Sequence, residues 1–199
     1  MKPIVFLVGL YPLGRWIVLA WQQELTANPT EFLTRSSGTW TLVFLIIALC
    51  VTPMRFWLDQ PALIRLRRMC GLFAFFYATL HMLAWAWWDQ GLVWQDMLRD
   101  TYTRPFVTVG VVAFVVLLLM AMTSSQKAMR MMGRGWKRLH RMVYLVAVLV
   151  IVHFWLHKAG KNDFSEVAIY GLVMAGLLLW RFWRHIKPEK GIGQARRSG

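Results

Sequence analysis

Three of the five histidines, His81, His140 and His153, lie within long apolar stretches of the chain. Ionisable residues are costly in stretches that cross a membrane, and they usually serve a function there. Neutral imidazole is a good ligand for iron, and two imidazoles from neighbouring helices can fill both axial positions of one heme. A single histidine of this kind is a hydrogen-bonded packing residue about as often as it is a ligand. The spacing of the three histidines is therefore more informative than any one of them.

The spacing places His81 and His153 at one level. His81 comes 13 residues after Arg68, and His153 comes 15 residues after Arg138, where Arg68 and Arg138 precede the two apolar stretches. At 1.5 Å per residue, each histidine lies roughly 20 Å from the same end of its helix. We therefore predict that His81 and His153 are the axial ligands of one heme b. Low-spin iron with two imidazoles suits electron transfer, because no site is left open for oxygen.

His140 precedes His153 by 13 residues, or about 3.6 turns of an α-helix, which places the two at different depths along one predicted helix. This spacing is typical of a helix that carries two stacked hemes. The partner stretch has arginine at positions 67 and 68, however, so a second bis-histidine heme is not supported. Three roles stay open for His140: ligand of a second heme, contact with a heme propionate, or part of a flavin or quinone site.

Six apolar stretches are long enough to position these residues across a membrane, for which about 20 mostly apolar residues are needed. Their expected bounds are residues 3–21, 38–57, 69–88, 105–122, 139–157 and 166–183. Charged residues make up only 16% of the chain, against about 25% in a soluble domain. We predict an all-α integral membrane protein, a bundle of six transmembrane helices. It forms a single membrane domain over residues 1–199, with a basic tail at 186–199.

The formal charge of +14 would suggest nucleic acid as a partner of a soluble protein, but here the basic residues lie between the apolar stretches. Segments 54–68, 123–141 and 181–199 hold four, six and six basic residues. The loops on the other side hold seven of the nine acidic residues. The positive-inside rule then places both termini in the cytoplasm. We predict contact with membrane lipid and no nucleic-acid site.

Two arginines are candidates for contact with heme propionates, because a guanidinium can engage both oxygens of a carboxylate. Arg15 lies inside the first stretch, where an arginine costs roughly 3 kcal/mol. Its alternative role is to extend to the membrane surface. Arg104 lies in the loop before the fourth stretch, where a solvated loop charge is the alternative.

Several short motifs between residues 38 and 185 resemble a known family. They are Thr52-Pro53, Gln60-Pro61, Arg67-Arg68, Gly71-Leu72, Ala78-Thr79-Leu80-His81, Arg104-Pro105, Thr123-Ser124 and the run from Gly133 to His140 that continues to Tyr144 and His153. Together they resemble the MsrQ family of heme-binding membrane subunits, which serve methionine sulfoxide reductase systems. The order Trp, Leu-His, Tyr and distal His also resembles the wider ferric-reductase-like transmembrane domain.

The resemblance implies a subunit of the bacterial inner membrane that holds heme b, with flavin mononucleotide (FMN) also associated with the family. It implies that electrons come from the quinone pool or a cytoplasmic flavin reductase. They pass to MsrP, a periplasmic molybdenum-cofactor enzyme that reduces methionine sulfoxide in oxidised proteins. The family's histidines correspond to His81, His140 and His153. In this role the chain is a non-catalytic electron-transfer subunit of an oxidoreductase system.

Two other functions compete with this one. A transmembrane ferric or cupric reductase would use a similar cytochrome b bundle and release electrons to a metal ion. A transporter with histidines as proton relays is less favoured, because the sequence shows no inverted repeat and little polar lining. The chain also has no GxGxxG fingerprint, so it needs a separate electron donor.

Overall fold

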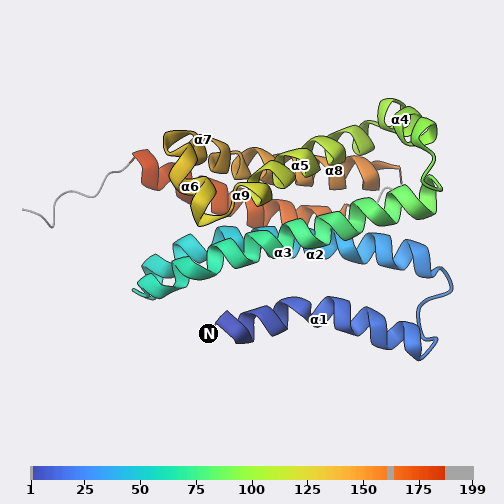
Figure 1. Ribbon diagram of the computed structural model, residues 1–199, viewed down its shortest axis with the longest axis horizontal. Helices are drawn as coiled ribbons and strands as arrows, with labels where there is room; N and C mark the ends of the chain where they lie inside the picture. Colours follow the sequence, from blue (N-terminus) through green and yellow to red (C-terminus); the bar gives the residue numbers. More distant parts are fainter. Residues whose placement is uncertain (1, 161–163, 187–199) are drawn as a thin grey trace, which may run out of the picture.

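The computed structural model describes residues 2–160 and 164–186, and these residues form helices joined by short turns, with no strand among them (Figure 1). Six helical segments of the described chain are long and apolar enough to cross a membrane. The predicted all-α bundle of six spans is therefore confirmed, and the chain is a multi-pass membrane protein. The predicted basic tail lies, apart from Ile186, outside the described residues.

The spans follow one another up and down the bundle. They are built on α1 (Lys2–Trp21), α2 (Pro29–Trp57), α3 (Ile64–Ala84), α5 (Pro105–Met122), α8 (Val143–Ala159) and α9 (Ser165–Ile186). Three shorter helices connect them: α4 (Trp94–Thr103), α6 (Gln126–Met132) and α7 (Arg134–Arg141). A 3-10 turn, Pro61–Leu63, precedes α3, and a π-helical turn, Trp85–Asp89, follows it.

The two ends of the bundle differ in charge. Figure 1 shows that α1 begins and α9 ends at the end where α6 and α7 lie, which we call the basic end. The opposite end, where α4 lies and where α2 and α5 begin, is called the acidic end. Segment 123–141, with six basic residues and no acidic one, lies at the basic end.

α2 begins nine residues earlier than the expected start at residue 38. The Asn28 side chain caps the helix by accepting a hydrogen bond from the backbone N–H of Glu31, 3.1 Å away, and Pro29 occupies the first turn. Hydroxyl groups along this polar segment donate to carbonyls within the same helix, as Thr34 does to Thr30 over 2.9 Å. Because these polar groups are satisfied, a segment too polar to predict as a span extends the start of the helix by about two and a half turns.

α2 also continues past Pro53 to Trp57, although a proline usually ends a helix because it lacks a backbone N–H. The carbonyl that loses its helical partner belongs to Leu49, four residues earlier. Arg181 of α9 supplies a replacement donor: its Nη2 lies 2.7 Å from the Leu49 carbonyl oxygen and 3.0 Å from the Thr52 hydroxyl. The proline is thus accommodated by a cross-link between the second and last spans.

The fifth predicted span, residues 139–157, is interrupted near its start. α7 ends at Arg141 and α8 begins at Val143, with Met142 in a turn between them. His140 therefore lies in α7 and not in the same continuous helix as His153.

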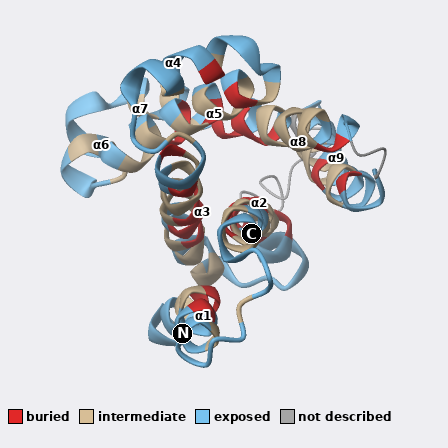
Figure 2. Ribbon diagram, turned by 90° about the vertical axis from the view of Figure 1, so that its right-hand side faces the viewer, coloured by how far each residue is buried: buried red, intermediate tan, exposed pale blue. Residues whose placement is uncertain are grey.

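All six spans contribute buried residues to the core, and aromatic rings stack in the part where α1, α2 and α3 meet. The rings of Phe44 and Tyr77 are parallel with centroids 5.4 Å apart, and Phe73 stacks on the other side of Phe44 at 5.2 Å. The Tyr77 hydroxyl donates to the Gly9 carbonyl over 2.8 Å, which fixes α1 to α3. Figure 2 shows α1 at the edge of the bundle, largely exposed, as expected of a helix that faces lipid on most sides.

Candidate cofactor site

A cavity of about 280 Å³ lies toward the acidic end of the bundle, between the α2–α3 pair and the α5–α8 pair. Most of its lining is apolar, with Leu42, Ala78, Phe114 and Val150 as examples. Apolar walls with few polar groups are typical of a cofactor pocket between the helices of a bundle.

The structure brings His81 and His153 together across this cavity. His81 comes from α3 and His153 from α8, and their ring centroids are 6.0 Å apart with the planes at 86°. Two imidazoles that bind one metal from opposite sides, each with its nitrogen about 2 Å away, hold their rings roughly 6 Å apart. The observed separation therefore suits a shared metal ion.

Each ring is held by a backbone carbonyl of the neighbouring helix. His81 Nδ1 lies 2.8 Å from the carbonyl oxygen of Thr34 on α2. His153 Nδ1 lies 2.7 Å from that of Phe106 on α5. A carbonyl only accepts, so Nδ1 carries the hydrogen in both rings and the neutral tautomer leaves the lone pair on Nε2. Metal-binding histidines typically donate their second N–H to such a partner, which fixes the ring orientation.

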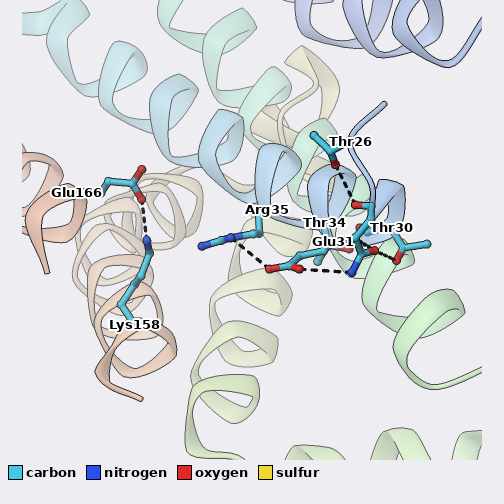
Figure 3. Close-up of polar contacts among 8 residues, drawn as sticks. Thr26, Thr30, Glu31, Thr34, Arg35, Lys158 and Glu166 are labelled. Carbon is cyan, nitrogen blue, oxygen red and sulfur yellow. Dashed lines mark hydrogen bonds and ion pairs between the residues drawn. The ribbon is translucent and has the colours of Figure 1, made fainter. Parts of the chain in front are cut away.

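Three basic side chains lie at the rim of the cavity: Arg35, Arg104 and Lys158. Figure 3 shows Arg35 paired with Glu31 on α2, and Lys158 of α8 paired with Glu166 of α9. Lys158 is buried, with its side chain 5% exposed, and its Nζ lies 3.0 Å from Glu166 Oε2. Such a rim suits the carboxylates of a porphyrin, because charge-assisted hydrogen bonds to cations hold them firmly.

Asp100 of α4 holds Arg104 in place at this rim. Its Oδ1 lies 2.9 Å from Arg104 Nε, and its Oδ2 accepts hydrogen bonds from Trp85 Nε1 and Gln90 Nε2 at 3.0 and 3.1 Å. The π-helical turn that carries Trp85 is thereby fixed to α4, and unusual turns of this kind are frequent at functional sites.

Two residues predicted as site candidates are not at the cavity. Arg15 is exposed on α1, which packs against α3 at the edge of the bundle. His140 lies at the basic end, where its ring stacks on Trp136 with centroids 4.1 Å apart and its Nε2 lies 3.2 Å from Thr123 Oγ1. Of the five predicted site residues, the cavity is therefore lined by His81, His153 and Arg104.

Sequence reasoning did not identify three other residues that line the cavity: Arg35, His157 and Lys158. His157 is one turn after His153, and this spacing alone places it on the same helix face. Arg35 is not predicted as a site residue from the sequence, because the expected second span begins only at residue 38. Lys158 gives no such signal, since a lysine at the end of a span usually marks the membrane surface.

The fold and the cavity define a helical membrane protein with a histidine-lined pocket between two helix pairs, and comparison with known proteins makes this class more specific. Residues 37–151 match the family described as ferric reductase like transmembrane component. No solved structure is significantly similar to the chain.

Several curated relatives share the same name. A protein-methionine-sulfoxide reductase heme-binding subunit MsrQ of Bordetella pertussis is 57% identical over 187 residues, covering 92% of this chain and 91% of that one. Proteins with the same name are 48% identical in Polaromonas naphthalenivorans and 37% identical in Xanthomonas oryzae pv. oryzae, covering 92% and 99% of this chain and 84% and 91% of the relatives. The chain therefore belongs to the MsrQ family of ferric-reductase-like membrane subunits, as its motifs predicted.

Proposed function

We propose that the chain binds heme b and is the non-catalytic electron-transfer subunit of a membrane methionine sulfoxide reductase system. The observation that carries this proposal is the His81–His153 pair, with rings 6.0 Å apart in an apolar cavity and both Nδ1 atoms bonded to backbone. The printed name of the relatives, heme-binding subunit, supports the same cofactor.

His81 and His153 would hold the iron through Nε2, one from each helix pair. A heme ligated in this way supplies a one-electron carrier with no open iron position for oxygen. The carbonyls of Thr34 and Phe106 fix the orientation of the two rings through Nδ1. The apolar walls exclude water. The basic side chains of Arg35, Arg104 and Lys158 would bind the propionates.

The proposed orientation puts the basic end in the cytoplasm and the protein in the bacterial inner membrane. The distribution of lysine and arginine between the two ends supports it. The cavity then lies toward the periplasm, within reach of a docked MsrP-like molybdenum enzyme that would accept the electrons. The donor would be the quinone pool or a cytoplasmic flavin reductase.

Reconstitution into liposomes tests the direction and the acceptor. The heme is reduced with a quinol or a flavin reductase, and its reduced absorption band is followed after a secreted MsrP-like enzyme is added. We expect reoxidation only when both this enzyme and methionine sulfoxide are present. A band that is reoxidised by chelated ferric or cupric ions but not by the enzyme would instead support the alternative function, a metal reductase, which the ferric-reductase-like family match favours.

FMN binding is a separate proposal that rests on the family resemblance. His140 and Trp136 form a stacked pair at the basic end, and this end would face a cytoplasmic donor. The proposed roles of His140 thus remain a second heme or a flavin or quinone site, both apart from the cavity. Extraction of flavin and heme from the purified protein, each quantified per chain in the wild type and His140→Ala, tests these roles.

A further inference from the structure

The two cavity histidines are held by one arrangement that occurs twice. Each histidine donates a hydrogen bond from Nδ1 to a backbone carbonyl oxygen 47 residues earlier in the chain: His81 to Thr34 and His153 to Phe106. One helical turn after each carbonyl is a glycine, Gly38 or Gly110, 43 residues before the histidine. The sequences around these positions are otherwise different, which explains why no internal repeat is visible in the sequence.

Each glycine lies directly against the edge of its histidine ring. A Cβ added to Gly38 would lie 3.1 Å from His81 Cε1 and 3.2 Å from its Nδ1. At Gly110 the corresponding distances to His153 are 2.9 Å to Cε1 and 2.8 Å to Nδ1. Non-bonded carbon atoms prefer about 3.5–4.0 Å, so both rings occupy space that a side chain would need.

The backbone does not require glycine at either position. Both residues lie inside regular helices, and neither has a positive φ. Glycine in a helix interior lowers helix stability relative to alanine, so its presence here needs another explanation. Close packing between helix backbones does not explain the two glycines, because the nearest atoms to each added Cβ all belong to the histidine ring.

We propose that Gly38 and Gly110 are positioning residues for the two histidines. Without a Cβ, each ring edge rests on the helix surface, and Nδ1 reaches the carbonyl one turn back. That contact turns Nε2 toward the cavity. An alanine would lift the ring, lengthen the Nδ1 hydrogen bond and change how Nε2 is presented to a metal. This inference rests on the proposed function, because it assigns the two glycines to the same heme ligands.

Four alanine variants of the full-length protein test the proposal. Gly38→Ala and Gly110→Ala change the histidine contacts. Gly9→Ala is the packing control, since its Cβ would lie 2.4 Å from the Phe73 ring, away from the cavity. Gly176→Ala is the neutral control, with nothing within 4 Å. Heme per chain, the low-spin absorption and EPR spectra, and the midpoint potential are measured for each.

We expect Gly110→Ala to lower heme affinity by about 10- to 100-fold, the range for loss of a group that orients a metal ligand, and to shift the midpoint potential of the heme that remains. Gly38→Ala should act in the same direction but less strongly, because its contact is looser. Gly9→Ala should lower thermal stability and leave the spectrum and potential of the folded protein unchanged. If Gly110→Ala does not accumulate, the milder Gly38→Ala provides the spectral test.

Wild-type spectra and potentials in both Gly38→Ala and Gly110→Ala would overturn the inference, and so would an equal spectral change in Gly9→Ala. His153→Ala, measured in the same set, separates this failure from failure of the proposed function. If His153→Ala loses heme while Gly110→Ala is unchanged, only the role of the glycines is wrong. If His153→Ala retains the wild-type heme, the ligand assignment itself is wrong.

Discussion

The acidic and basic ends of the bundle both carry histidines that contact other polar or aromatic groups, but the contacts of their rings differ. At the acidic end, His81 and His153 each bond a backbone carbonyl through Nδ1 and face one another across a cavity. At the basic end, Nε2 of His140 lies against the Thr123 hydroxyl, and the ring face is covered by Trp136.

This difference separates two histidines whose geometry suits metal binding from one whose ring is stacked on an aromatic side chain. A histidine in an apolar stretch is suited to bind a metal when one nitrogen is fixed by the protein and the other faces a cavity shared with a second ligand. His81 precedes His153 by 72 residues. The residue 72 positions before His140 is Arg68, so Arg68 takes the corresponding place in the first helix pair. An arginine there offers no lone pair, so the basic end does not repeat the paired arrangement.

The largest effect should come from removing a cavity histidine. We expect His81→Ala and His153→Ala each to lower heme affinity by more than about 100-fold, the upper range for loss of an outer partner, because a direct ligand is lost. Heme per chain is measured by the pyridine hemochrome assay. His157→Ala is the matched control, since it lines the same cavity one turn away and should retain heme. Full heme content in both ligand variants would contradict the pair.

A smaller effect is expected at the rim, on the midpoint potential. Lys158 is buried at the cavity, and a nearby positive charge favours the reduced, less positive heme. Lys158→Met should therefore lower the potential by about 60 mV, a tenfold change for one electron. Arg35→Met is the control: Arg35 is 46% exposed, so water screens its charge and the shift should be smaller. A potential that rises in Lys158→Met would contradict the proposed rim.

At the basic end, the cross-link between α2 and α9 should affect stability and not the cofactor. Arg181→Met leaves the Leu49 carbonyl without its donor, which should cost about 1–3 kcal/mol of unfolding free energy. In a Pro53→Ala background residue 53 regains its N–H, so the cost should be smaller. Thermal or denaturant unfolding in detergent measures both. An equal cost in the two backgrounds would show that Arg181 does not compensate for the proline.

His140→Ala should leave the spectrum and potential of the cavity heme unchanged, because its ring lies outside the cavity lining. Absorption spectra recorded during a redox titration provide the measurement. A fall in total heme per chain with the cavity component intact would assign His140 to a second heme. Loss of the absorption signal of the cavity heme would contradict the proposal that His140 and the cavity histidines act at separate sites.

The smallest effect is expected for Arg15→Gln. Arg15 is exposed on α1 and does not line the cavity, so heme content and midpoint potential should match the wild type. The same hemochrome assay and titration serve here. A midpoint potential shifted as far as that of Lys158→Met would indicate that Arg15 does contribute to the cofactor site.

The spans and the paired histidines could be predicted from the sequence because both depend on length and hydropathy. The fourth span, residues 105–122, coincides with α5 at both bounds, since Arg104-Pro105 and Thr123 mark sharp changes of polarity. His81 and His153 could be placed at one level because a helix rises by a constant amount per residue.

The remaining features depend on contacts between distant segments, which hydropathy does not record. The polar start of α2 is helical because Asn28 caps it and its hydroxyls bond backbone. The turn at Met142 interrupts an apolar stretch with no proline or glycine to mark it. The roles of Gly38 and Gly110 depend on which side chain lies opposite, and a glycine in an apolar stretch gives no sign of that.

Division of the two histidines between separate helix pairs also constrains biosynthesis. α2 and α3 leave the ribosome well before α8, so the nascent membrane protein for a time presents His81 with no opposing ring. If the proposed assignment holds, an iron porphyrin would find both histidines only after the fifth span has inserted and the two helix pairs have met. Cofactor loading would then be a late step of maturation, and a chain interrupted before α8 would be inserted in the membrane yet lack one of the two proposed ligands.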